Sequence, residues 1–339
     1  MIAALRTVVA FAVALAVTRQ ICQPGSWLHV LDHPNERSLH TRAVPRTGGV
    51  AILVGVAVAA LLYIGTNGAE MAAIGVAAAS VIVAVVSFID DRQGLSVRAR
   101  LLGQVGSALL VVGSGLTAPG LGLPGTVWAW PLALAATASA LYLVWMMNLY
   151  NFMDGMDGFA GGMAMIGFGT LAVLGALAGN TVFVAVSLAI AAASAGFLVF
   201  NFPPARIFMG DSGSATLGLL AGSLSIWGAR DGVFPFWVAL LVFSPFIVDA
   251  TVTLVRRLLR GERVWQAHKT HYYQRLVQSG WGHRKTVLHE YGLMLACGLA
   301  AVLTRFLGPV GQWLVIASGI FVYVALMVVV SRIEKAAAK

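Results

Sequence analysis

Long apolar runs, separated by short polar segments, make up most of the chain. We count eleven runs with almost no charge inside them: 1–18, 48–65, 71–89, 99–118, 127–147, 160–178, 181–201, 214–229, 234–256, 288–307 and 310–331. An apolar helix of about 20 residues is long enough to cross the hydrocarbon core of a bilayer. The pattern therefore predicts an all-α polytopic membrane protein with about eleven transmembrane helices, forming one domain over residues 1–339.

The composition supports this prediction. Hydrophobic residues make up 59% of the chain and charged residues 10%, whereas a soluble globular domain carries about 25% charged residues. One run such as 181–201 is also compatible with a buried helix of a large soluble protein, but eleven such runs are not. The first run has no small-x-small cleavage site and is followed by Arg19, which favours a retained helix over a signal peptide.

Basic residues gather on one side of the predicted bundle. If successive runs cross the membrane alternately, the loops on one side and the adjoining helix ends hold 19 of the 22 Lys and Arg. The positive-inside rule makes this side cytoplasmic, and an odd number of helices places the C-terminus there too. The net charge of +9 is spread over membrane-edge loops, so we expect no nucleic acid partner. Two cysteines are too few for a disulfide framework or a cysteine metal cluster.

Acidic residues gather on the same side. Eleven of the 13 Asp and Glu lie in its loops or at the neighbouring helix ends. A transporter or channel places its few charges within the spans, along the transport pathway. The distribution therefore favours an enzyme embedded in the membrane that works at the cytoplasmic face. A cation-coupled transporter is the alternative from another class, and Asp249, near the end of the ninth run, comes closest to supporting it.

The first polar loop, residues 31–49, has the composition of an anion site. Its basic residues include His40 and Arg42, and it ends in the pair Gly48-Gly49. Arginine forms forked hydrogen bonds with phosphate, and glycine lets a backbone come close to it. The alternative is a basic flank that only satisfies the positive-inside rule.

The pair Asp90-Asp91 ends the third apolar run. Adjacent carboxylates repel each other, and the C-terminal end of a helix is already partly negative. A cation offsets this cost, and Mg²⁺ favours one or two carboxylates together with substrate phosphates. The alternative is a solvated turn in which Asp91 pairs with Arg92.

Two further stretches combine aspartate with glycine. In residues 151–162, Asn151 precedes Asp154 and Asp157, and the two aspartates share one face if the segment is helical. In the other stretch, Asp211 opens a glycine-rich helix start after a pair of prolines. Such a start presents free N–H groups to phosphate, while a simple helix-capping role for the aspartate is the alternative.

The last loop, residues 256–286, is the longest and is strongly basic. His268 and His271 lie three apart, hence on one face if the segment is helical. A basic membrane flank and a zinc pair are the alternatives. Because no further soft ligand lies nearby, we predict phosphate binding instead. Asp249 faces the same loop and is placed to orient a His or an Arg.

These stretches come from separate loops on one side of the predicted membrane. A carboxylate cluster that holds Mg²⁺, surrounded by Arg and His, suits phosphoryl transfer, in which catalysis is mostly positioning and charge neutralisation. In motif order and spacing the chain resembles the polyprenyl-phosphate N-acetylhexosamine-1-phosphate transferases. The motifs that carry this resemblance are "PNERSLHTRAVPRTGG", "FIDDR", "NFMDGMDGFAGG", "FMGDSGSATLG" and "AHKTHYYQRL".

The resemblance implies transfer of a sugar 1-phosphate from a UDP-N-acetylhexosamine to undecaprenyl phosphate in the bacterial inner membrane. UMP is released, Mg²⁺ is required, with Mn²⁺ as a substitute, and a homodimer is compatible with the family. The implied catalytic residues are Asp90 and Asp91, and the implied metal ligands are Asp211 and Asp90. The implied substrate-binding residues are Asn151, Asp154, Asp157, His40, Arg42, His268 and His271.

Two departures from the family pattern bear on the substrate. The last loop reads His-Lys-Thr-His rather than a run of consecutive His, which argues against phospho-N-acetylmuramoyl-pentapeptide transfer, the alternative within the family. The motif is closer to that of the branch that starts O-antigen synthesis. The family's first-loop Lys beside the glycine pair is absent, and Arg42 or Arg46 is the candidate replacement.

Overall fold

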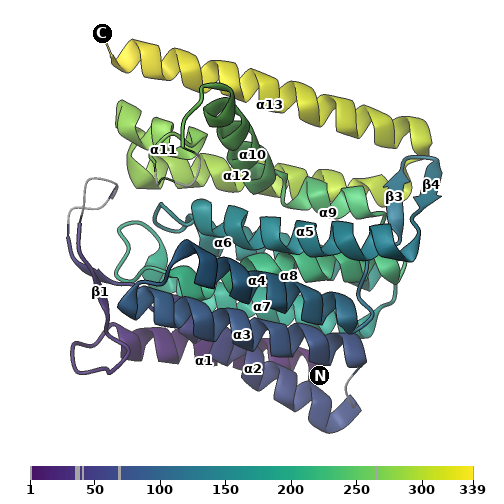
Figure 1. The fold of residues 1–339 in the computed structure, drawn as a ribbon, viewed down its shortest axis with the longest axis horizontal. Coiled ribbons are helices and arrows are strands. Elements are labelled where there is room, and N and C mark those ends of the chain that lie inside the picture. Colours follow the sequence, from purple (N-terminus) through teal and green to yellow (C-terminus); the bar gives the residue numbers. More distant parts are fainter. Residues whose placement is uncertain are drawn as a thin grey trace.

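Helices account for nearly all secondary structure in the computed structural model, and they lie side by side in one bundle (Figure 1). The structure describes every residue except 1, 35–38, 40, 41, 68, 69, 264, 265, 267 and 339. The long helices are α1 (Ile2–Ile21), α2 (Gly48–Asn67), α3 (Met71–Gln93), α4 (Val97–Gly113), α5 (Leu132–Phe152), α6 (Phe159–Leu177), α7 (Thr181–Asn201), α8 (Asp211–Arg230), α10 (Ser244–Leu259), α12 (Gly282–Leu303) and α13 (Pro309–Ala337).

Short elements connect these helices. They are α9 (Phe236–Val242), α11 (Tyr272–Leu276), the π-helical turn η1 (Val277–Trp281), the 3₁₀ turn η2 (Thr304–Phe306), β1 (Leu31–Asp32), β2 (Val44–Pro45), β3 (Gly120–Leu123) and β4 (Thr126–Ala129). Strand β1 pairs antiparallel with β2, and β3 with β4. The β1–β2 hairpin, α11 and the C-terminus lie at one end of the bundle, and β3 and β4 lie at the other (Figure 1).

Within the described residues, eight helices are long and apolar enough to cross a membrane, or nine if α9 and α10 form one span bent by 82°. This confirms an all-α polytopic membrane protein, whereas the exact number of eleven spans is not confirmed. Two predicted runs fall short of this test, those over α4 and α8. Helix α4 has only 17 residues and carries Arg98 and Arg100 near its start.

Helix α8 lies inside the bundle, which explains why it contains many small polar residues. Every residue from 212 to 228 is buried, and α8 packs against α5, α3 and α2. A Cβ atom on Gly218 would overlap the backbone carbonyl of Met146 in α5. Small residues allow membrane helices to approach this closely. A helix shielded from lipid by its neighbours does not need a fully apolar surface.

We predict that Gly218→Ala lowers the free energy of unfolding by about 1–3 kcal/mol, because the added methyl group forces α8 away from α5. Gly292→Ala in α12 is the matched control. A Cβ atom there meets nothing within 4 Å, and alanine favours a helix by about 1 kcal/mol over glycine. Thermal unfolding of both purified variants measures the difference. Equal effects of the two substitutions would contradict the close packing of α8.

Candidate active site

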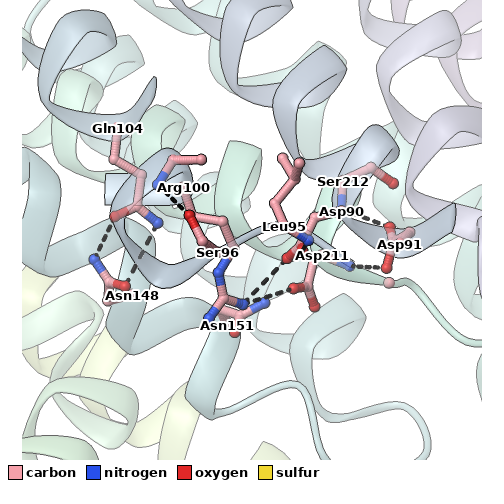
Figure 2. Close-up of polar contacts among 12 residues, drawn as sticks. Asp90, Asp91, Leu95, Ser96, Arg100, Gln104, Asn148, Asn151, Asp211 and Ser212 are labelled. Atoms are coloured by element: carbon pink, nitrogen blue, oxygen red, sulfur yellow. Dashed lines mark hydrogen bonds and ion pairs between the residues drawn. The ribbon is translucent and has the colours of Figure 1, made fainter. Parts of the chain in front are cut away.

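The carboxylate of Asp91 fastens the end of α3 to the start of α8. Its Oδ1 accepts a hydrogen bond from the N–H of Asp211 (3.2 Å), and its Oδ2 accepts one from the N–H of Ser212 (3.1 Å; Figure 2). The next two N–H groups of the helix donate to the carbonyl of Gly210. The first turn of α8 therefore has no free N–H for a phosphate, which corrects our interpretation of this glycine-rich start as a phosphate site.

The guanidinium of Arg100 in α4 lies between two carboxylates. Its Nη1 is 3.1 Å from Oδ2 of Asp90 and 3.7 Å from Oδ2 of Asp211 (Figure 2). The other oxygen of Asp90 accepts a hydrogen bond from the N–H of Leu95. Sequence reasoning missed Arg100 as a site residue. The available signal was its position ten residues after Asp90, in a helix that turns back beside α3.

Asn151 lies in the last turn of α5, beside the same carboxylates. Its Nδ2 donates to Oγ of Ser214 in α8 (3.0 Å), and its side chain also hydrogen-bonds to Asp211. About one turn earlier in α5, Asn148 donates to Oε1 of Gln104 in α4 (2.8 Å). The structure thus brings the predicted substrate-binding Asn151 to the predicted metal ligand, and amide side chains join α4, α5 and α8 around them.

Residues 153–158 form a loop rather than a helix. Asp154 and Asp157 therefore do not share a helical face, which corrects our interpretation of their spacing. Burial raises the pKa of Asp154 well above its usual value, and the charges of Asp211 and Asp91 raise it further. Within the described residues, the carboxylate of Asp154 has no hydrogen bond and no ion pair. In the described structure, no hydrogen bond or ion pair therefore offsets the repulsion between Asp154 and the neighbouring carboxylates.

Asp157 turns to different partners. Its Oδ1 lies 3.0 Å from Nδ1 of His283 in α12, and its Oδ2 accepts a hydrogen bond from the N–H of Ala205 (3.0 Å). Its side chain is 13% exposed. Both oxygens are therefore engaged within the protein, and Asp157 holds its loop against α12 and the segment that precedes α8. Its predicted contact with substrate stays a prediction.

The glycine pair of the first loop approaches protein backbone. The N–H of Gly48 donates to the carbonyl of Phe208 (3.0 Å), and the N–H of Gly49 donates to the carbonyl of Met209 (2.8 Å). A Cβ atom on either glycine would overlap its surroundings. The pair is needed for the packing of α2 against the start of α8, which corrects the suggestion that it makes room for phosphate.

The basic residues of the first loop differ in their relation to the carboxylates. His40 lies outside the described residues. Arg42 is exposed. Arg46 is close enough to Asp91 and Asp211 to interact electrostatically with both, and its Nη1 lies 3.8 Å from Oδ1 of Asp32. Of the two candidates for the basic residue beside the glycine pair, Arg46 is therefore the one that the structure brings to the carboxylates.

Asp249 organises the last loop. Its Oδ1 lies 3.2 Å from Nδ1 of His271 and accepts a hydrogen bond from the N–H of Tyr272 (2.9 Å). Its Oδ2 accepts one from the N–H of Tyr273 (3.1 Å). The prediction that Asp249 orients a His is thereby confirmed. The Tyr273 hydroxyl donates to the carbonyl of Phe152 (3.3 Å), so the histidine loop packs beside the loop that carries Asp154.

His268 and His271 precede α11 and do not lie on a helix, but their ring centroids are only 4.8 Å apart. Nδ1 of His268 accepts a hydrogen bond from the N–H of Thr270 (3.3 Å), so the proton of the neutral ring is on Nε2. Burial, together with the neighbouring His271 and Arg257, lowers the pKa of His268 to about 4. At neutral pH, His268 is therefore an uncharged hydrogen-bond donor.

The donor set of this site fits magnesium better than zinc. Among the residues that the structure describes, no three His, Cys, Asp or Glu are grouped closely enough to hold a metal by themselves. Mg²⁺ needs only one or two carboxylates, together with water and substrate phosphates. Asp90 and Asp211 already share one cationic group, that of Arg100. The catalytic and metal-binding roles of these residues remain predictions.

We predict that Asp157→Asn lowers the free energy of unfolding by about 1–3 kcal/mol, because it removes the ionic partner of His283. Asp154→Asn is the matched control three residues away. It breaks no hydrogen bond or ion pair of the described structure and relieves repulsion, so stability stays equal or rises. Thermal unfolding in metal-free detergent solution compares the two, and an equal loss would contradict the different placement of these side chains.

The lowered pKa of His268 predicts a pH effect on stability. Between pH 4 and about 6.5, the folded protein binds fewer protons at His268 than the unfolded chain does, so the free energy of unfolding decreases as the pH falls through this window. The midpoint temperature of the wild type should thus fall more from pH 7 to pH 5 than that of His268→Gln. Parallel curves for the two proteins would contradict the burial of this ring.

Comparison with known proteins places this site in a family. The family model described as glycosyl transferase family 4 matches residues 73–229, which include Asp90, Asp154 and Asp211. A probable undecaprenyl-phosphate N-acetylglucosaminyl 1-phosphate transferase of Bacillus subtilis (strain 168) is 33% identical over 309 residues, covering 89% of this chain and 86% of the relative.

Two further relatives also match most of this chain over most of their own length. A decaprenyl-phosphate N-acetylglucosaminephosphotransferase of Mycolicibacterium smegmatis is 33% identical over 337 residues, covering 87% of this chain and 80% of the relative. A phospho-N-acetylmuramoyl-pentapeptide-transferase of Moorella thermoacetica is 30% identical over 277 residues, covering 76% and 83%. These matches extend over most of each chain and confirm the resemblance that the motifs indicated. The chain therefore belongs to glycosyl transferase family 4.

Proposed function

We propose that this protein transfers an N-acetylhexosamine 1-phosphate from a UDP-sugar to a polyprenyl phosphate and releases UMP, with Mg²⁺ as cofactor. The observation that carries the proposal is the sharing of Arg100 between Asp90 and Asp211, beside Asp154, at one end of an apolar bundle. Phosphoryl transfer depends on positive charge positioned around the reacting phosphates, and carboxylates that can hold Mg²⁺ next to an arginine are suited to supply it. The printed names of the relatives describe acceptors with a phosphate on a long hydrocarbon chain.

In this proposal Asp211 would hold Mg²⁺, with Asp90 as the second carboxylate, and the ion would supply positive charge to the phosphates of the donor. Asp91 fixes the start of α8 and thereby the position of Asp211. The amide of Asn151 interacts with the Asp211 side chain and favours its ionised form. These contacts keep the carboxylates in place before substrate arrives, so little reorganisation is needed during the reaction.

The reaction is an attack by an oxygen of the lipid phosphate on the phosphorus that bears the sugar. The bond from that phosphorus to the bridging oxygen of the diphosphate breaks, and UMP leaves. Arg100 and Arg46 are placed to stabilise the negative charge of the phosphates. His268 offers a neutral N–H donor, and Asp249 holds His271 in a fixed orientation. Both histidines are therefore suited to bind phosphate oxygens.

The lipid acceptor accounts for the location of the site. A polyprenyl chain dissolves in the bilayer, while its phosphate stays at the interface with the UDP-sugar. We infer that the site faces the cytoplasm in the bacterial inner membrane, because the basic loops lie at the same end as the carboxylates and follow the positive-inside rule. The product is then the first lipid-linked intermediate of a cell-envelope polysaccharide such as O-antigen.

Two alternatives are less well supported. Transfer of a muramoyl-pentapeptide fits a relative at 30% identity, but the last loop here reads His-Lys-Thr-His. A cation-coupled transporter had its best support in Asp249 within a span. That carboxylate is occupied by His271, the Thr253 hydroxyl and two backbone N–H groups, so it is not a free site for a transported cation.

We predict that the purified protein releases UMP from UDP-N-acetylglucosamine only when both Mg²⁺ and polyprenyl phosphate are present. Asp211→Asn should lower kcat by about 100-fold or more, because it removes the main ligand of the ion that neutralises the reacting phosphates. Arg98→Ala is the control, since this residue is an exposed arginine in the same helix as Arg100. The measurements are the rates of UMP release with Mg²⁺, with Mn²⁺ and with EDTA.

A panel of UDP-N-acetylhexosamines and UDP-N-acetylmuramoyl-pentapeptide then identifies the donor. Release of UMP without lipid phosphate, or full activity of Asp211→Asn, would overturn the proposal. Activity with the pentapeptide donor alone would favour the alternative branch of the family.

A further inference from the structure

A pair of adjoining cavities lies away from the carboxylates, among α10, α11, η1 and α13. One has a volume of about 390 Å³ and the other about 540 Å³, and both are lined by Arg256 of α10. The C-terminus of α13 and α11 lie together at one end of the bundle (Figure 1). Of α13 itself only Val330 is buried, so this helix leaves open space along its length instead of sealing it.

The lining of these cavities is strongly basic. The basic residues that line one or both are Arg256, Arg257, Arg260, Lys269, Arg275, Arg332 and Lys335. Among the described lining residues, Glu334 is the only carboxylate, and its Oε2 is already bonded by Nε of Arg275 (3.2 Å). Glu262, outside the lining, pairs with Arg257 (2.8 Å) and lies 3.9 Å from Arg260, so two carboxylates face seven basic groups. The remaining like charges repel each other, and an anion in the cavity would relieve that repulsion.

One buried atom points to an acceptor that the protein does not provide. Arg275 is only 8% exposed, and its Nε and Nη2 atoms are bonded to Glu334 and Ser331. Its Nη1 is buried without a hydrogen-bond partner in the described structure. A buried guanidinium N–H without an acceptor costs free energy. The guanidinium lies over the ring of Tyr272 (4.8 Å to the centroid) and lines the larger cavity, so a small movement of the side chain would bring this N–H to an anionic group there.

The smaller cavity also has an apolar wall. Val324, Met327 and Val328 of α13 line it beside Ser331, Arg332 and Lys335. Because α13 is long and apolar enough to span a membrane, these aliphatic side chains lie on the membrane side of its basic end. A ligand that fits both parts has a negatively charged head and a hydrocarbon tail.

We propose that these cavities bind an anionic phospholipid of the bilayer, with its phosphate on the arginines and its acyl chain along α13. Basic clusters at the ends of membrane helices attract anionic headgroups by about 1 kcal/mol per charge. One loop, which carries His268 and His271, connects these cavities to the candidate active site. Lys269 and Thr270 line the larger cavity, and the Thr270 N–H holds Nδ1 of His268. Lipid binding therefore stabilises the loop that carries both histidines.

The test measures lipid binding and needs no catalysis. The full-length protein in neutral detergent is titrated with dioleoyl-phosphatidylglycerol or dioleoyl-phosphatidylcholine, and thermal unfolding is followed. We expect a rise in midpoint temperature with phosphatidylglycerol only. The double variant Arg332→Ala/Lys335→Ala should weaken the apparent affinity by about fivefold per charge removed, or roughly 30-fold. Arg98→Ala/Arg284→Ala, which removes two exposed arginines outside the cavities, should respond like the wild type.

Three results would overturn the proposal. Equal stabilisation by the zwitterionic lipid would exclude recognition of charge, and stabilisation by inorganic phosphate alone would exclude a role for the acyl chain. A loss of polyprenyl phosphate binding in Arg332→Ala/Lys335→Ala that equals its loss of phosphatidylglycerol binding would assign the cavities to the acceptor lipid. Because each readout is binding or stability, failure here is separate from failure of the proposed transferase activity.

Discussion

The two hydrogen bonds from the start of α8 to the carboxylate of Asp91 are the constraint on which the candidate active site depends. They join the end of one helix to the start of another that is 120 residues away in sequence. Because α8 is buried from residue 212 to residue 228, it cannot shift without disturbing its neighbours. The core of the bundle therefore fixes the position of Asp211, and the packing of α8 restricts movement at the site.

This arrangement concentrates negative charge, which must be offset. Asp90, Asp91, Asp154 and Asp211 influence one another electrostatically. Two like charges about 4 Å apart repel by about 4 kcal/mol near a protein surface, which is comparable to much of the net stability of a domain. Arg100 and Arg46 offset part of this repulsion. An excess of carboxylates over basic partners favours binding of a further cation, which supports the magnesium ion that we propose for this site.

The sequence predicts the position of most helices because a lipid-facing helix must be apolar, whatever its neighbours are. The same rule also counted the run over α8 (214–229) as a span, but α8 falls short of the test for a membrane-crossing helix because its surroundings are other helices, not lipid. The gathering of Asp90, Asp154 and Asp211 at one end follows from the alternation of runs and loops. The pairing of Asp157 with His283 does not, because it joins residues 126 apart through the packing of α12. The roles of Gly48 and Gly49 were likewise hidden, since glycine fits close backbone contact and phosphate binding equally well.

The bend between α9 and α10 explains how Asp249, a carboxylate within an apolar run, comes to contact the histidine loop. The two helices meet at 82°, next to Pro245 at the start of α10. Proline lacks the N–H that a continuous helix would use, so a break at this point costs little. The bend directs α10 to α11, where Asp249 accepts the N–H groups of Tyr272 and Tyr273 and holds His271. A straight span would have left Asp249 without these partners. Asp249, the carboxylate that seemed to favour a transporter, therefore supports the histidine loop.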